Sequence, residues 1–205
     1  DLGTTDAVGI IRYDPAKSLF QNFPFQTSCI IPYSDNNVLI PHYTYCYTLN
    51  VTTGDRTEIP NVNPLLLGSG PSTASIDGNE IFSFIYKIKN QTQLLNKYNV
   101  TTHQRILREN TEDEIYNRLF IDHKSRLWAV SGKQDESRWI IEIDKKTLNE
   151  VRRFKFPAIK NNNPFAFISA WLPAGNGKLW LGTLDGLFLF DPDEPDENKQ
   201  WKHWG

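Results

Sequence analysis

The 205-residue sequence has no methionine, only two cysteines and no long apolar run. Without an apolar stretch of about 20 residues it predicts no membrane-spanning helix, and it shows no signal peptide. Basic and acidic residues nearly balance at a net charge of −2, and the basic ones form no stripe. Because phosphate binding needs a concentrated basic face, we do not expect a nucleic acid partner. Since methionine is absent, residue 1 is not a native start, and we expect a processed or excised piece.

Motifs for metal or covalent chemistry are missing as well. The four histidines are scattered over the chain, with no HExxH pattern beside them. The acidic run DPDEPDE (191–197) lacks the glycine and the ligand spacing of a calcium loop, so we interpret it as a solvated loop. We therefore expect no catalytic residue, no metal and no cofactor in this chain.

What the sequence does contain is a repeat of apolar segments. Alternating segments, typical of strands, are followed by an Asp or Asn that opens a short turn, often with a threonine two or three places later. These turn residues are Asp14, Asn50, Asn99, Asp144 and Asp191, and they lie 36 to 49 residues apart. A period of about 45 residues that holds about four short strands is typical of a propeller blade.

We therefore predict an all-β fold, a β-propeller fragment of about four to five four-stranded blades from a larger propeller, for which we expect seven. The predicted blades are residues 1–24 (partial), 25–60, 61–110, 111–157 and 158–205. A β-sandwich also has regularly spaced strands, but it need not repeat one strand-turn-strand pattern five times. Residues 1–24 hold less than a whole blade, so remaining blades of a parent chain are expected to cover the open edges.

The two cysteines fall in one predicted blade. Cys29 lies in its first strand and Cys46 in its third, which places them about 10 Å apart. A disulfide needs Cα atoms within about 7 Å, so we predict two unpaired thiols and no disulfide.

The segment GKLWLGTLDGLFLFDP (177–192) resembles the repeat of the two-component regulator propeller family. In that repeat, Gly-x-Leu-Trp-Ile-Gly-Thr is followed by Asp-Gly-Leu and a strand that ends in Tyr-Asp-Pro. DLGTTDAVGIIRYDP at the start and SRLWAVSG (125–132) are similar to it. The resemblance implies the periplasmic, carbohydrate-sensing region of a Bacteroides-type hybrid histidine kinase and response regulator. The parent would be a homodimeric inner-membrane kinase, with its phosphate-transferring parts outside this chain.

Several residues of the repeat have a structural explanation. Trp128 and Trp180 take the same position in their blades, which favours packing between blades over stacking on a sugar. Gly182-Thr183 and Asp185-Gly186 have no nucleophile and base beside them. We interpret them as a tight turn that needs glycine at positive φ, not as a catalytic loop.

Ligand binding is expected on the face where a propeller groups its longer loops. With the strands of each blade named a to d in chain order, these are the b–c and d–a loops. The candidate ligand-binding residues on them are His42, Tyr43, Lys87, Arg138, Lys160 and Asn162. We predict that this face recognises an oligosaccharide and that the chain is not itself an enzyme.

Two other functions remain open. A polysaccharide lyase or hydrolase would need two carboxylates about 5–10 Å apart, whereas the acidic residues gather in the single loop at 109–116. A protein-interaction propeller of the WD type would carry Trp-Asp ends and Gly-His starts, which this repeat lacks.

Overall fold

The chain folds into successive antiparallel sheets in the computed structural model. The structure describes residues 10–14, 19–23, 30–34, 36–41, 46–59, 74–87, 92–110, 114–133, 138–157, 168 and 170–205. These residues form a two-stranded ribbon and four four-stranded sheets, each built from strands consecutive in the chain. We number the sheets as blades from the N-terminus, with the ribbon as the first.

The strands of the first two blades are β1 (Ile10–Asp14) and β2 (Leu19–Phe23), then β3 (Ile31–Ser34), β4 (Asn37–Pro41), β5 (Cys46–Asn50) and β6 (Arg56–Glu58). The third blade contains β7 (Ala74–Asp77), β8 (Glu80–Lys87), β9 (Thr92–Asn99) and β10 (Arg105–Glu109). The fourth contains β11 (Glu114–Ile121), β12 (Leu127–Lys133), β13 (Arg138–Ile143) and β14 (Glu150–Lys155). The fifth contains β15 (Ala170–Ala174), β16 (Lys178–Thr183), β17 (Gly186–Phe190) and β18 (Trp201–Trp204), with the short 3-10 turn η2 (Glu197–Lys199) before β18.

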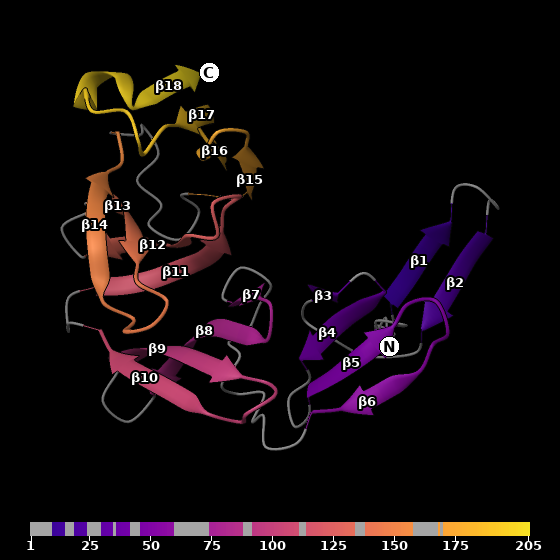
Figure 1. The fold of residues 1–205 in the computed structure, drawn as a ribbon. Coiled ribbons are helices and arrows are strands. Elements are labelled where there is room, and N and C mark those ends of the chain that lie inside the picture. The colour runs from indigo at the N-terminus through magenta and orange to yellow at the C-terminus, as the bar shows by residue number, and fades with distance from the viewer. Residues whose placement is uncertain are drawn as a thin grey trace, which may run out of the picture.

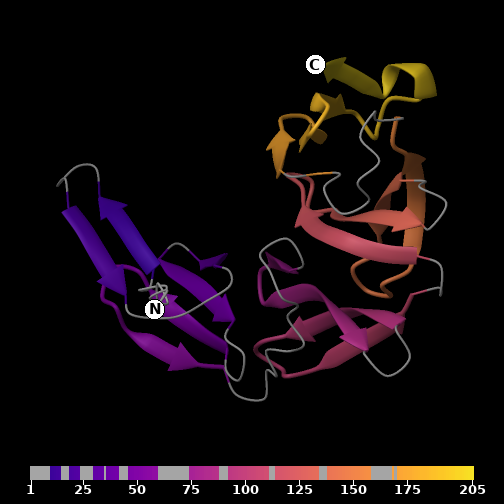
Figure 2. The same ribbon diagram turned by 180° about the vertical axis from the view of Figure 1, so that it is seen from behind.

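The blades follow one another along an open arc (Figures 1 and 2). Strand β7 contacts both β3 and β11, so the first strands of successive blades meet on the inner side of the arc. The last strands β6, β10, β14 and β18 lie on the outer side. This radial order of four-stranded antiparallel sheets confirms the prediction of an all-β propeller fragment.

The hydrophobic core consists of layers between neighbouring blades. Separate clusters join the second blade to the third, the third to the fourth and the fourth to the fifth. Each layer contains the large side chain near the start of strand b, namely Leu39, Phe82 and Trp128, and all three are 0 % exposed. Burial of these side chains against the next sheet supplies the main favourable term that holds the arc together.

The turn between strands c and d has one geometry in three successive blades. The side-chain oxygen of Asn50 accepts hydrogen bonds from the backbone N–H groups two and three residues later, and Asn99 and Asp144 do the same. The fourth residue after each has positive φ, with values of 81° at Gly54, 58° at His103 and 60° at Leu148. An Asx side chain that pairs these two donors is what lets such a turn close.

Replacing Asn99 with alanine should lower the free energy of unfolding by about 1 kcal/mol, because two backbone donors lose their side-chain acceptor. Urea denaturation followed by tryptophan fluorescence measures the change. Thr101→Ala in the same turn is the matched control, since its N–H can still donate to Asn99. Equal effects of the two substitutions would contradict a role for the Asn99 side chain.

The b–c turn of the fifth blade needs glycine at only one position. Gly186 has φ of 119°, and a Cβ placed there would lie 2.3 Å from the carbonyl oxygen of Trp204. Gly182 instead lies within β16, paired with Ala170 and Leu187, and is not among the glycines at positive φ. The expectation of positive φ was therefore wrong for Gly182, because the strand continues to Thr183.

Candidate functional site

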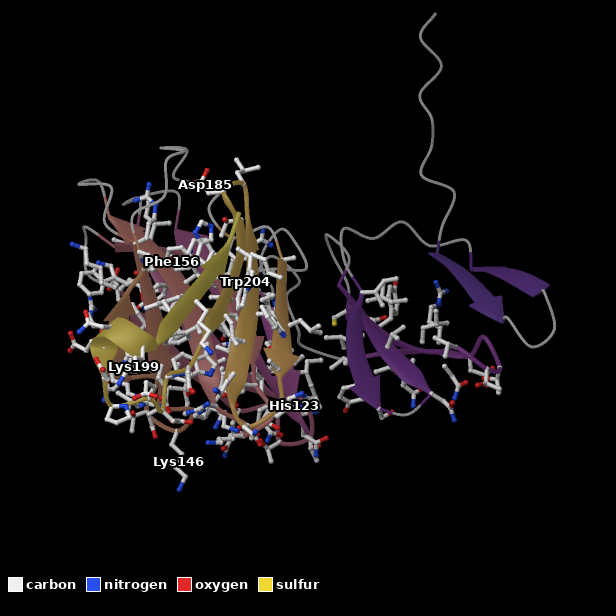
Figure 3. All side chains as sticks on the ribbon, turned by 90° about the horizontal axis from the view of Figure 1, so that it is seen from above. His123, Lys146, Phe156, Asp185, Lys199 and Trp204 are labelled. Carbon is white, nitrogen blue, oxygen red and sulfur yellow. The ribbon has the colours of Figure 1, made fainter. Side chains whose placement is uncertain are left out.

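The two ends of the blades carry different loops. In Figure 3, Asp185 of a b–c turn lies at one end, and His123 and Lys146 of the a–b and c–d turns lie at the other. We call the first the loop face and the second the turn face. Ligand binding was predicted for the loop face, and the described residues show how its strand ends are held.

Most of the predicted ligand-binding residues lie outside the described part of the chain. This applies to His42, Tyr43, Lys160 and Asn162, and to Cys29 of the predicted thiol pair. Two others were expected in b–c loops but lie in strands: Lys87 ends β8 and Arg138 begins β13, because these strands extend further than the alternation indicated.

The side chain of Arg138 is folded into the sheet. It is 7 % exposed, and a Cβ built on Gly132 of the paired strand would lie 3.5 Å from its Cδ. Glycine at 132 therefore leaves the space that this arginine occupies. Cys46, the described member of the two cysteines, is likewise 0 % exposed, within the core between the second and third blades.

The side chain of Gln93, which we call the Gln93 clamp, joins described residues of the third and fourth blades. The side-chain oxygen of Gln93 accepts hydrogen bonds from the Tyr116 backbone N–H at 2.7 Å and from Asn110 Nδ2 at 3.1 Å. Its Nε2 donates to the Tyr116 carbonyl at 2.6 Å. One side chain thus joins the start of strand c to the end of strand d and to the next blade.

A second anchor joins the fourth blade to the segment that enters the fifth. Arg118 Nε donates to the carbonyl oxygen of Ile168 at 2.9 Å, and burial of this guanidinium lowers the pKa of Arg118. The Gln93 clamp thus joins described residues on both sides of one d–a connection, and the Arg118 contact holds Ile168 at the entry to the fifth blade. A rigid scaffold that presents loops in this way is a common basis of binding sites.

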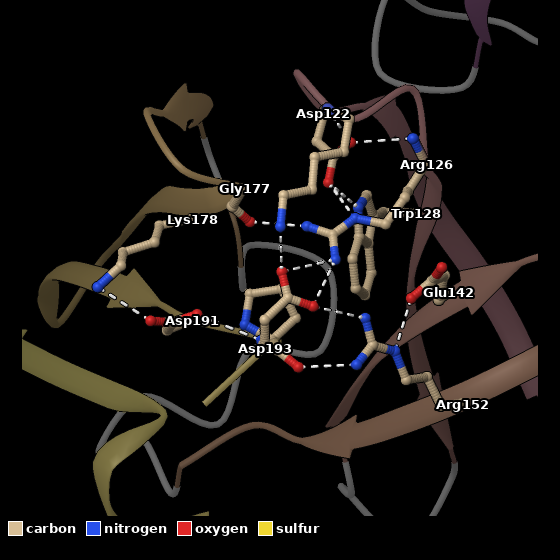
Figure 4. A network of polar contacts seen from close by, with 11 residues as sticks. Asp122, Arg126, Trp128, Glu142, Arg152, Gly177, Lys178, Asp191 and Asp193 are labelled. Atoms are coloured by element: carbon tan, nitrogen blue, oxygen red, sulfur yellow. Dashed lines mark hydrogen bonds and ion pairs between the residues drawn. The ribbon is translucent and has the colours of Figure 1, made fainter. Parts of the chain in front are cut away.

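The turn face contains a polar network centred on a buried carboxylate (Figure 4). The side chain of Asp122 is 0 % exposed. It accepts hydrogen bonds from Arg126 Nε at 2.6 Å, from Trp128 Nε1 at 3.0 Å and from the backbone N–H groups of Lys124 and Arg126 at 2.9 Å. Burial alone would raise the pKa of Asp122, but these hydrogen bonds outweigh it and lower the pKa.

Asp193 of the fifth blade completes this network from the other side. Arg126 Nη1 and Lys124 Nζ of the fourth blade each donate to its carboxylate at 2.8 Å, and Arg152 Nη2 lies 3.2 Å away. Arg152 also donates to the Pro192 carbonyl at 2.8 Å. Asp193 belongs to the acidic run that was expected to be a solvated loop; it is exposed, and it also pairs with three basic side chains of the fourth blade.

Because of the charge on Asp193, the free energy of unfolding should depend on pH in the acidic range. Partial burial raises the pKa of Asp193, but hydrogen bonds from Lys124 and Arg152 and the charge of Arg126 lower it from 3.8 to about 2. Since the folded pKa is the lower one, the stabilising contribution is complete above the unfolded value and is lost as pH falls through about 2.

Asp193→Asn should therefore flatten the dependence of the free energy of unfolding on pH between about 4 and 2. At neutral pH its cost should stay below about 1 kcal/mol, because exposed ion pairs are screened by water. Urea titrations at several pH values measure both effects, with Asp185→Asn in a b–c turn as the control. If the free energy of unfolding of Asp193→Asn fell with decreasing pH as steeply as that of the original protein, the role given to the Asp193 carboxylate would be contradicted.

The network joins the fourth blade to the fifth through ion pairs and hydrogen bonds. Its carboxylates are paired with arginine, lysine and indole donors, which keeps them ionised and hydrogen bonded. Within the described ranges, no group of three His, Cys, Asp or Glu side chains is placed to hold a metal ion. Among the same residues, no helix has the length and apolar character needed to cross a membrane.

Comparison with solved structures places the chain among the propellers. The extracellular domain of a putative one-component system of B. thetaiotaomicron is similar over 97 % of this chain, with a TM-score of 0.62 and 17 % identity. The extracellular domain of a putative hybrid two-component system of the same organism is similar over 96 %, with a TM-score of 0.58 and 12 % identity. A luciferin-regenerating enzyme is similar over 91 % of this chain and 66 % of its own, with a TM-score of 0.57 and 14 % identity.

The chain spans only about a quarter of the two extracellular domains, 27 % and 25 % of their lengths. At these identities the likeness shows the fold. Two of these similar structures are extracellular domains of putative two-component and one-component systems. No protein-family model matches the sequence, and no curated protein matches it either.

Proposed function

We propose that the chain is a ligand-sensing segment of an extracytoplasmic propeller in a hybrid two-component sensor, and that it recognises an oligosaccharide. The proposal is carried by the agreement between a sequence repeat and the fold. The repeat GKLWLGTLDGLFLFDP occurs in a chain whose fold is similar, over nearly its whole length, to extracellular domains of putative regulatory systems. The proposed location is the periplasm, with the kinase and the remaining blades in other parts of a homodimeric parent.

The loop face is the proposed binding surface. The Gln93 clamp holds Asn110 and Tyr116 beside one of its loops, and the Arg118 contact holds Ile168 before the fifth blade. The predicted loop residues carry planar, cationic or amide groups that can hydrogen bond to hydroxyls or to a sugar acid. A ligand that bridges loops from several blades could change how the blades are held and so transmit a signal.

A glycan array on the complete extracytoplasmic region tests the proposal. A variant with alanine at His42, Tyr43, Lys160 and Asn162 should bind the recognised oligosaccharide at least about tenfold more weakly, which corresponds to about 1.4 kcal/mol. The matched control carries His123→Ala and Lys146→Ala on the turn face. Equal loss of binding in both variants, or no bound glycan, would contradict the proposal, while newly released reducing ends would favour a polysaccharide-acting enzyme.

A further inference from the structure

A short turn at the turn face joins the first two strands of the fifth blade. Strands β15 and β16 pair as far as Ala174 and Lys178, which leaves Gly175, Asn176 and Gly177 in the turn. Asn176 and Gly177 both have positive φ, at 63° and 79°. They form the only Asn-Gly pair in the sequence, and Asn176 is exposed. The turn therefore presents to water an asparagine that is followed by a backbone nitrogen without a hindering side chain.

Neither the side-chain amide of Asn176 nor the backbone N–H of Gly177 is held in place. Within the described part of the chain, neither group takes part in a hydrogen bond. The c–d turns differ in this respect. Asn99 Oδ1 accepts from two backbone N–H groups at 3.0 and 2.9 Å, and the N–H of Val100 donates to a carbonyl of its own blade. The Asn176 side chain is therefore free to rotate toward the next backbone nitrogen, whereas that of Asn99 is fixed.

Two basic side chains of the fourth blade lie against this turn (Figure 4). Arg126 Nη2 donates to the carbonyl oxygen of Gly177 at 2.8 Å. A Cβ built on Gly177 would lie 2.7 Å from Lys124 Cε and 2.8 Å from Arg126 Nη2, so only glycine fits at this position. Positive charge beside an acidic N–H favours the deprotonated form. The turn thus combines an unhindered nitrogen, a free amide and neighbouring cations.

The pair Asp77-Gly78, in the a–b turn of the third blade, provides an internal comparison. The carboxylate of Asp77 pairs with Lys145 and accepts a hydrogen bond from Ser125. The hydrogen bond from Lys145 lowers the pKa of Asp77, which keeps this group ionised. The negative charge of a carboxylate opposes attack by a backbone nitrogen, while the neutral amide of Asn176 does not. Of these two turns, only the one at Asn176 has a reactive side chain.

We propose that Asn176 is a site of spontaneous covalent modification, at which the side chain deamidates through a cyclic imide. The Gly177 nitrogen loses its proton and forms a bond to Asn176 Cγ, and the side-chain nitrogen leaves as ammonia. Water then opens the imide at either carbonyl and gives aspartate or isoaspartate. No oxidant or enzyme takes part in these steps. The proposal is independent of the ligand that the loop face takes.

The two products should act differently on the junction between the fourth and fifth blades. Isoaspartate routes the backbone through the side-chain carbon, so the turn becomes longer and the Gly177 carbonyl moves away from Arg126. Arg126 also binds Asp122 in its own blade and Asp193 in the next, so its displacement would weaken both ion pairs. Aspartate keeps the length of the backbone and adds only a negative charge near basic side chains. We therefore expect isoaspartate, and not aspartate, to destabilise the junction.

The test ages the folded 205-residue chain in mildly alkaline buffer below its unfolding temperature. Tryptic digestion and tandem mass spectrometry then follow aspartate and isoaspartate at position 176 and, as the internal control, at position 99. Product should form at least about tenfold faster at Asn176 than at Asn99, because Asn99 is held by its turn and is followed by the β-branched Val100. Equal rates, or no product at position 176 in the folded chain, would overturn the proposal.

Urea denaturation of the same samples tests the effect on the junction. The urea midpoint of the aged chain should fall, and treatment with an isoaspartyl methyltransferase, which converts isoaspartate to aspartate, should restore it. Asn176→Asp should keep the midpoint of the fresh protein. Asn176→Gln, in which the imide would need a larger ring, should keep its midpoint through ageing. An equal loss in aged Asn176→Gln, or isoaspartate at position 176 without any fall in the midpoint, would overturn the effect on the junction.

Discussion

Replacing Trp128 with alanine is expected to lower the free energy of unfolding by about 3–5 kcal/mol, the usual range for a large aromatic side chain removed from a core. The indole is 0 % exposed and contacts Phe154 and Phe190 at ring-centroid distances of 6.2 and 6.1 Å. Removal opens a cavity between two blades and also deprives Asp122 of its indole donor. Urea denaturation followed by far-ultraviolet circular dichroism measures the loss without depending on tryptophan emission.

Trp180→Ala is the matched control, because Trp180 follows leucine in the same repeat position. Its side chain is only half-buried, and the expected loss is about 1–2 kcal/mol. Trp128→Phe should fall between the two, since it keeps an aromatic ring and removes the hydrogen bond. Equal losses for Trp128→Ala and Trp180→Ala would mean that the fifth blade does not bury Trp128 as the structure shows.

Asp122→Ala is expected to cost a similar amount, about 3–5 kcal/mol, because it removes one partner from a buried ion pair. Arg126, whose side chain is 13 % exposed, would lose its buried carboxylate, and Trp128 Nε1 would lose its acceptor. The two backbone donors that close the a–b turn would also be left to water. Thermal or urea denaturation at neutral pH measures the effect.

Asp196→Ala provides the control for a carboxylate in an exposed cap. Asp196 accepts from the Asn198 backbone N–H and pairs with Lys199 at 3.0 Å, but it lies at the surface beside η2. Its loss should be well below that of Asp122→Ala. A cost under about 1 kcal/mol for Asp122→Ala would contradict the network, because the substitution removes the buried acceptor of both Arg126 Nε and the Trp128 indole.

The fold could be predicted because its signals are local and repeated. An Asx residue that closes a turn makes its hydrogen bonds two and three residues away, so Asn50, Asn99 and Asp144 indicate their turns from sequence alone. Alternation of apolar residues predicts strands, and the near-constant period of the pattern predicts blades. Strand ends were less accurate, since Lys87 and Arg138 lie in strands where loops were expected.

The networks could not be predicted because their partners are far apart in the chain. Asp193 meets Arg126 across 67 residues and Arg152 across 41. Read along the sequence, it is simply one member of an acidic run. Gln93 reaches Tyr116 across 23 residues, and no motif marks it. Asp122 did leave a weak signal, because it stands four residues before Arg126 and closes a local turn.

The central claim is that successive four-stranded blades pack face to face in chain order. A double-mutant cycle between Trp128 and Phe190 tests it most directly, because the two rings belong to neighbouring blades and meet edge to face at 84°. The cycle should give a coupling free energy of about 0.5–1.5 kcal/mol, the range for aromatic pairs. A coupling of zero, with both single variants folded, would contradict the packing of the fifth blade on the fourth.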